Sequence, residues 1–313
     1  MRISWATAII AAFAFVACQR EIAKPPAAPA SNDSRPVLFI PADLELVLRL
    51  DVRRYRETMG PEPEQSLAKL WQSFGLDSSG KFQHFDWLVP VLKSTDTLWL
   101  GCRPGPVGCR DFVFVLRGRF ASSSSAYGFG PSKKRRDLGA GWLSYELESE
   151  RRTTAARLYW RAPGLAILVS CAELDSAERS IEQSLDRTKL EPSENGLVSL
   201  IVQSKALALS IRDRSPQAAR WLEQSERVEI HFDSSERGTR VTFSVKFRDA
   251  PQADRAAQAL RILISALSRF DPRLKTGDLE VQLLNSEVLL RVSFPTAVES
   301  GLSSPGELAP QER

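Results

Sequence analysis

Alternation of apolar and polar residues is clearest in the second half of the chain. Apolar residues occupy every second position over 228–232 and again over 241–247, on either side of a polar turn at 234–238. A period of two places successive side chains on opposite faces, so this pattern predicts an antiparallel hairpin with one buried face. A second hairpin is predicted over 279–294, with its turn at Asn285.

Helical spacing of apolar residues is found at three places. Pro251 suits the first turn of a helix, and an apolar stripe follows it from Ala253 to Phe270. Two shorter stripes lie at 67–74 and 174–185. We expect these helices to cover the strands.

The first half of the chain predicts strands with longer connections. Two apolar runs at 37–40 and 44–50 are separated by a Pro-Ala-Asp sequence, which indicates strand, turn and strand. Further strands are predicted, in chain order, at 97–101, 111–120, 142–147, 158–160 and 165–170.

These elements predict an α+β fold in which helices cover antiparallel sheets. The halves share one order of elements, and either two related hairpin-and-helix modules or chance similarity of common elements explains it. One continuous sheet built from both halves is an allowed variant. In this comparison 197–211 parallels 37–52, 228–247 parallels 97–120, and 279–294 parallels 142–170. The predicted parts are a first module at 37–190, a second at 196–297, and a flexible tail at 298–313.

The N-terminus has the pattern of an export signal. Arg2 precedes an uncharged run of 15 residues, which is short for a membrane-spanning helix but suits the apolar core of a signal peptide. The run ends in FVAC, which resembles the lipobox of bacterial lipoproteins, although Leu is more usual than Phe15. The resemblance implies a signal peptide over 1–17 and a lipid on the thiol of Cys18. An ordinary signal peptide cut after Ala14 is the alternative.

A spacer follows the cysteine. Residues 18–36 are rich in Pro, Ala, Ser and charges, so we expect a disordered tether. Gln19 stands where many lipoproteins of the inner membrane carry Asp, so the resemblance implies the outer membrane, with the body on its periplasmic face or at the cell surface. The segment from Val37 to Tyr55 is similar to the start of uncharacterised secreted or lipid-anchored proteins of Gram-negative bacteria, which implies location and fold but no activity.

Composition and charge add one candidate surface. The chain is 43% hydrophobic and 26% charged, which suits a globular core. Its net charge of +4 is too weak to indicate nucleic-acid binding, because proteins that bind duplexes usually have a concentrated basic face. One basic run is formed by Lys133, Lys134, Arg135 and Arg136. Its spacing does not fit a phosphate-binding loop. It is either a polar, flexible loop or a contact to an anionic surface such as lipid head groups.

The remaining cysteines suggest structure rather than catalysis. Cys102 and Cys109 flank a turn-rich loop between two predicted strands, and in an oxidising compartment a disulfide there would contribute about 2–3 kcal/mol. Zinc is the rival, but it needs four ligands, and no such set is found near them. Cys171 ends an apolar strand and is predicted to be a buried thiol. We expect no metal or other cofactor.

One cluster of polar residues has chemical potential. Glu229, His231 and Asp233 alternate along a predicted strand, so all three point to one face and could hold a metal ion. A solvated face with paired charges explains the same pattern. His84 has no partner pattern and is predicted to be structural.

No familiar catalytic motif is found, so the sequence favours a non-enzymatic envelope lipoprotein that binds a protein or another envelope component. The alternative is a carrier or binder of an apolar small molecule or lipid in a pocket between sheet and helices. An enzyme built around Glu229, His231 and Asp233 is the third hypothesis.

Overall fold

Strands outnumber helices among the residues that the computed structural model of this protein describes. The structure describes residues 36–58, 88–105, 108–121, 135–139, 141–148, 154–161, 163–170, 175, 188, 190–213, 215–235, 238–270 and 278–295. The strands are β1 (Leu46–Asp51), β2 (Thr95–Gly105), β3 (Gly108–Gly118), β4 (Arg135–Gly139), β5 (Trp142–Glu148), β6 (Thr154–Arg161), β7 (Leu165–Ser170), β8 (Val198–Gln203), β9 (Ser225–Ser235), β10 (Gly238–Phe247), β11 (Asp278–Leu284) and β12 (Glu287–Pro295). The helices are η1 (Pro36–Phe39), α2 (Val52–Thr58), α4 (Leu88–Lys93), α6 (Ser204–Ile211), α7 (Pro216–Glu223) and α8 (Ala250–Phe270).

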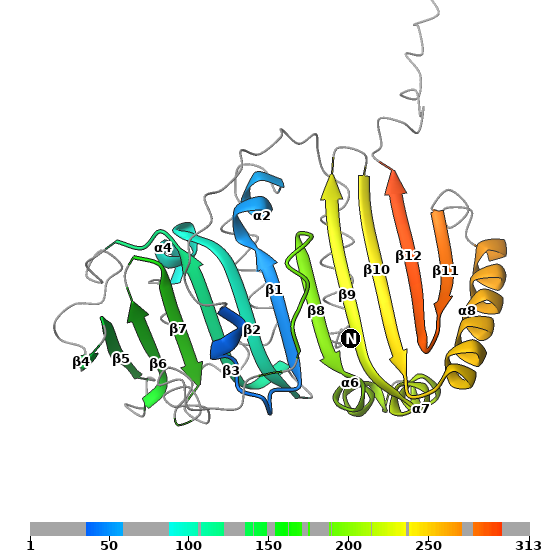
Figure 1. The fold of residues 1–313 in the computed structure, drawn as a ribbon, viewed down its shortest axis with the longest axis horizontal. Coiled ribbons are helices and arrows are strands. Elements are labelled where there is room, and N and C mark those ends of the chain that lie inside the picture. The colour runs from blue at the N-terminus through cyan, green and yellow to red at the C-terminus, as the bar shows by residue number, and fades with distance from the viewer. Residues whose placement is uncertain are drawn as a thin grey trace, which may run out of the picture.

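The strands join in one open antiparallel sheet of 12 strands, in the order β11-β12-β10-β9-β8-β1-β2-β3-β7-β6-β5-β4 (Figure 1). The predicted α+β class is therefore confirmed in its coarse form, a sheet-rich fold with few helices among the described residues. Of the arrangements left open by the sequence, the structure shows the single continuous sheet. Both halves contribute to one sheet, because β1 pairs with β8 at its centre.

The two halves have the same strand order. Outward from the central pair, one half is ordered β1-β2-β3-β7-β6 and the other β8-β9-β10-β12-β11. Among the described elements the halves differ at one connection: the chain forms the β4–β5 hairpin between β3 and β6, but forms α8 between β10 and β11. This correspondence agrees with the two-module interpretation, and the predicted module boundaries stay a prediction.

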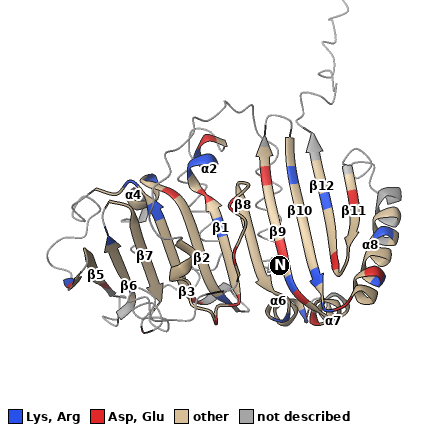
Figure 2. Ribbon diagram, in the orientation of Figure 1, with Lys and Arg blue, Asp and Glu red and all other residues tan. Residues whose placement is uncertain are grey.

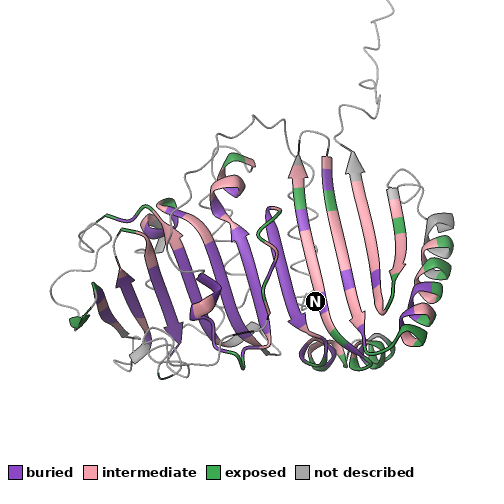
Figure 3. Cartoon of the chain, in the orientation of Figure 1, coloured by how far each residue is buried: buried purple, intermediate pink, exposed green. Residues whose placement is uncertain are grey.

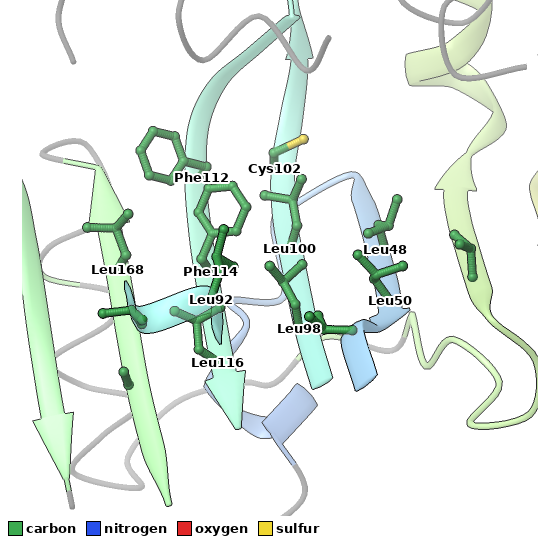
Figure 4. Close-up of a cluster of buried hydrophobic side chains, with 14 of the residues drawn as sticks. Leu48, Leu50, Leu92, Leu98, Leu100, Cys102, Phe112, Phe114, Leu116 and Leu168 are labelled. Carbon is green, nitrogen blue, oxygen red and sulfur yellow. The ribbon is translucent and has the colours of Figure 1, made fainter. Parts of the chain in front are cut away.

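One face of the sheet, here called the helix face, carries the main core. In β1, Leu46, Leu48 and Leu50 point to this face and are at most 2% exposed. Strands buried on both faces have mainly apolar sequences, as β1 and β8 do apart from Arg49 and Ser199. Figure 4 shows Leu48, Leu50, Leu98 and Leu100 from β1 and β2 beside Phe112, Phe114 and Leu116 from β3, with Leu92 of α4 packed among them.

The opposite face, here called the η1 face, is covered over the first half of the sheet. Val37, Phe39 and Ile40 pack there against Val47 and Trp99. The predicted strand at 37–40 is wrong, because this segment forms η1 and then packs across the sheet instead of pairing within it. An apolar run of four residues fits either role, and only the surface beneath it decides. Figure 3 shows the difference in burial between the two halves of the sheet.

The alternating hairpins are confirmed. β9 pairs with β10 across the predicted polar turn, and β11 pairs with β12 across Asn285. Asn285 has a φ of 56°, and Asn tolerates this left-handed conformation in two-residue hairpin turns better than most residues. The helix after Pro251 is confirmed as α8, whereas the stripes at 67–74 and 174–185 lie outside the described residues apart from Asp175.

The close approach of the η1 segment to β2 gives a test of the fold. A Cβ atom at Gly101 would collide with Ile40 Cγ2 and lie 2.9 Å from Leu44 Cδ1. We expect Gly101→Ala to lower the free energy of unfolding by about 1–3 kcal/mol in urea denaturation. Gly164→Ala is the matched control, because no atom lies within 4 Å of its added Cβ. Equal stability of the two variants would contradict this packing.

Candidate functional site

The η1 face changes from apolar to polar at the centre of the sheet. In one row of paired residues, Trp99 of β2 is followed by Arg49 of β1, Ser199 of β8, His231 of β9 and Thr242 of β10. Figure 2 shows charged positions along β9, β10 and β12, whereas β7 and β8 carry none. The polar side chains of this face therefore gather on the second half of the sheet.

A short hydrogen-bonded network lies in this row. Ser199 Oγ is 3.0 Å from His231 Nδ1, and His231 Nε2 is 3.4 Å from a Glu229 carboxylate oxygen. If the imidazole carries its proton on Nε2, Nδ1 accepts a hydrogen bond from the Ser199 hydroxyl and the Nε2–H group points to the Glu229 carboxylate. The hydrogen bond from His231 lowers the pKa of Glu229, partial burial opposes this, and Arg227, 2.8 Å away, lowers the pKa further.

The network resembles a catalytic triad in residue type but differs in access. Ser199 is 0% exposed, so a substrate cannot reach its Oγ in this structure. A nucleophile needs both an adjacent base and a path for the substrate. The contacts of Ser199 and Glu229 instead fix the orientation of the imidazole of His231.

The three residues predicted to share a face are only partly brought together. Glu229 and His231 are in contact, but Asp233 pairs with Arg54 of α2, whose guanidinium nitrogen lies 2.7 Å from its carboxylate. Across the described part of the chain, no group of three His, Cys, Asp or Glu side chains is arranged to hold a metal ion. These ion pairs favour the solvated, charge-paired face over the metal site.

Arg49 marks the boundary between the apolar and polar parts of the η1 face. Its side chain is 7% exposed, donates a 3.1 Å hydrogen bond to the carbonyl of Gly196 and lies over the ring of Trp99. Burial lowers the pKa of this guanidinium, and the nearby carboxylate of Asp51 opposes that effect. Arg49 thus ties the segment before β8 to β1.

The helix face is less well covered over the last four strands. Val288 and Phe247 are buried under Ala253 and Ala257 of α8, but the neighbouring apolar side chains are only half-buried. These half-buried residues are Ile230, Val241, Phe243, Val245, Leu279, Val281, Leu283, Leu290 and Val292. We call them the half-covered apolar face.

The basic run proves to be part of the sheet where it is described. Arg135 and Arg136 begin β4, the outermost strand of the first half, so the predicted loop is wrong at these two positions. All five residues of β4 are exposed. Lys133 and Lys134 lie outside the described residues.

Of the cysteines, the structure describes Cys102 and the backbone of Cys109. Cys102 is fully buried on the helix face, and β2 and β3 pair so that Cys109 lies opposite Pro104. The side chain of Cys109 lies outside those described, so the Cys102–Cys109 disulfide stays a prediction. Cys18, Cys171 and His84 also fall outside the described residues.

Sequence reasoning missed Ser199, Arg49 and Arg54. A polar residue inside an apolar strand was a usable signal for Ser199 and Arg49, but their partners lie on other strands. Arg54 follows the strand in α2, and nothing local indicates its pairing with Asp233.

The Glu229 contacts give a prediction with a pH dependence. We expect Glu229→Gln to lower the free energy of unfolding by about 1–2 kcal/mol near pH 7, because a neutral amide replaces a charge-assisted hydrogen bond. Since folding lowers the pKa of Glu229, the carboxylate stabilises the protein fully above its unfolded pKa. That contribution is lost as the pH falls through the folded value. In urea titrations, the difference between wild type and variant should therefore shrink on acidification.

Glu280→Gln is the matched control for this substitution. Glu280 pairs with Arg291 at 3.4 Å on the same face, but both side chains are more than 40% exposed. Exposed pairs contribute about 0–1 kcal/mol. A loss as large as that of Glu229→Gln, or a Glu229→Gln effect that grows on acidification, would contradict the interpretation.

Comparisons with known proteins give the fold but no family. No family model and no curated protein matches the chain. Crystal form I of TP0453 has a TM-score of 0.53 at 11% identity, covering 84% of this chain and 93% of that chain. Crystal form IV gives 0.51 at 11% identity, covering 83% and 94%. Within the described residues, no helix has the length and apolar character to cross a membrane. The chain is thus similar to TP0453 in its sheet-rich α+β fold.

Proposed function

We propose that this protein is a non-enzymatic lipoprotein of the bacterial outer membrane, anchored through Cys18, which binds a protein component of the envelope. The FVAC sequence at Cys18 and the Pro-rich spacer of 18–36 support the anchor. Two acyl chains on one cysteine give stable attachment, since each buried methylene contributes about 0.8 kcal/mol.

The observation that carries the binding proposal is the open edge at β4. Every residue of this strand is exposed, and among the described strands it pairs with β5 alone. An edge strand presents unpaired backbone donors and acceptors, which an extended segment of another protein can satisfy by adding a strand. Recognition of this kind needs neither a catalytic group nor a cofactor.

A second candidate function rests on the half-covered apolar face. Phe243, Leu290 and Val292 lie side by side on β10 and β12, and none is fully buried. Apolar side chains between a sheet and a helix are typical of sites for apolar ligands. This observation favours a carrier or binder of an apolar small molecule or lipid as the alternative.

The anchor is tested by metabolic labelling. In cells given radioactive palmitate, we expect label on the wild-type protein and none on Cys18→Ala, which should leave the membrane fraction. Gln19→Ala is the control, because it keeps the cysteine that would be acylated. Unlabelled wild type, or a mature N-terminus at residue 15, would refute the anchor.

Site-specific photocrosslinking tests the binding surface. A photoreactive amino acid in place of Leu138 on β4 should give discrete adducts with an envelope protein in living cells, because this side chain is 43% exposed at the edge. The same group at Leu284, which is 52% exposed at the far end of the sheet, is the matched control. Identical adducts at both sites would count against the β4 edge. Recovery of one stoichiometric apolar compound from the purified protein, identified by mass spectrometry, would favour the carrier instead.

A further inference from the structure

The two ends of the sheet differ in the elements that lie at their outermost strands. In the second half, α8 is inserted between β10 and β11 and packs beside the outermost strand (Figure 1). The Arg261 side chain of α8 donates to the carbonyl of Val281 on β11, 3.4 Å away. In the first half, the corresponding insertion is the β4–β5 hairpin, which extends the sheet by two strands.

No described helix covers the β4 end of the sheet. The β4 residues are exposed without exception, whereas Val281 and Leu283 of β11 are half-buried. Proteins usually protect an edge strand by covering it or by placing charges on it. β11 shows the first device, and β4 shows the second.

The charges on β4 have no acidic partners among the described residues. Neither Arg135 nor Arg136 forms an ion pair there, and the Asp137 carboxylate accepts the backbone N–H of Gly139 at 2.9 Å. Nearby on the η1 face, Arg161 lies 5.8 Å from the centroid of the Trp142 ring. Among the described residues the two guanidinium groups of β4 therefore have no carboxylate partner, since Glu146 of the neighbouring strand is paired with Arg157.

The two arginines point to opposite faces of the sheet. Arg135 pairs with Tyr145, which belongs to the core of the helix face, and Arg136 pairs with Ser144. Consecutive residues of a strand alternate between faces. A layer of lipid head groups that lies against one face of the sheet meets only one of the two guanidinium groups. A strand added at the edge meets both, because its own consecutive side chains alternate in the same way.

We propose that β4 binds an extended acidic segment of a partner protein as an added strand, with two consecutive carboxylates beside Arg135 and Arg136. The backbone edge supplies affinity for any extended chain, and the two cations select an acidic one. They also disfavour a neutral or basic strand. This inference rests on the proposed binding function and names the chemistry of its partner.

Fluorescence anisotropy tests the inference with the full chain in detergent. The probe is a labelled eight-residue peptide of Thr and Val around a central Glu-Glu pair. We expect saturable binding, and an increase in Kd of about fivefold for Arg135→Gln/Arg136→Gln, since each cross-strand ion pair contributes modestly. Arg220→Gln/Arg255→Gln removes two exposed charges from α7 and α8, and should leave Kd within about twofold.

Modified peptides separate strand addition from charge attraction. Two further peptides carry N-methyl groups on alternate backbone amides, one on the odd-numbered residues and one on the even-numbered residues. At least one of them should lose binding, because strand pairing needs the backbone N–H groups of alternate residues. A Gln-Gln peptide should bind the wild type as weakly as the Glu-Glu peptide binds the β4 variant. Undiminished binding of both methylated peptides, or equal loss in the two double variants, would overturn the proposal.

Two further outcomes would also overturn it. In the first, the protein needs Arg135 and Arg136 to bind phosphatidylglycerol vesicles but does not need them to bind the peptide. This result would assign the edge to a membrane. The other is a dimer, seen by sedimentation, that the β4 variant abolishes and the peptide does not dissociate. Peptide binding does not need the anchor, so Cys18→Ala should bind equally. Failure of the anchor and failure of the edge are therefore distinguishable.

Discussion

The pairing of β1 with β8 is the constraint on which the rest of the structure depends. It joins the two halves through five paired positions, from Leu46 with Val202 to Leu50 with Val198. Residues of both strands are buried in the same core on the helix face. Because the side-chain period of a strand is two, a slip of one residue here would move that whole apolar set to the other face. Every cross-strand contact farther out inherits this register.

The same register explains how one fold carries two kinds of surface. Residues aligned across the η1 face are apolar in the first half, where the η1 segment covers them, and polar in the second half. Several polar residues there pair with one another, as Glu229 does with His231 and Arg227. The surfaces that we propose for binding lie elsewhere, on the β4 edge and on the half-covered apolar face.

The periodicity of apolar residues along the chain correctly predicts the elements whose own sequence determines them. The hairpins of β9–β10 and β11–β12 follow from strict alternation, and α8 follows from its stripe after Pro251. The prediction of a strand at 37–40 is wrong because a short apolar run has the same pattern whether it pairs in a sheet or packs across one. The prediction of a loop at Arg135 and Arg136 is wrong because these residues form a strand by pairing with β5, which their own propensity does not indicate. The contact of Ser199 with His231 needed the register of strands 32 residues apart, which sequence alone does not provide.

The position at which the chain enters the fold has a mechanical consequence. The η1 segment leads directly into β1, which is hydrogen-bonded to β2 on one side and to β8 on the other. A pull on the N-terminus therefore loads the middle of the sheet, and both ladders must rupture together before β1 can leave. Attachment through an outer strand would let the sheet unzip one ladder at a time. This entry point makes the body resistant to force along the very segment by which a tether would hold it.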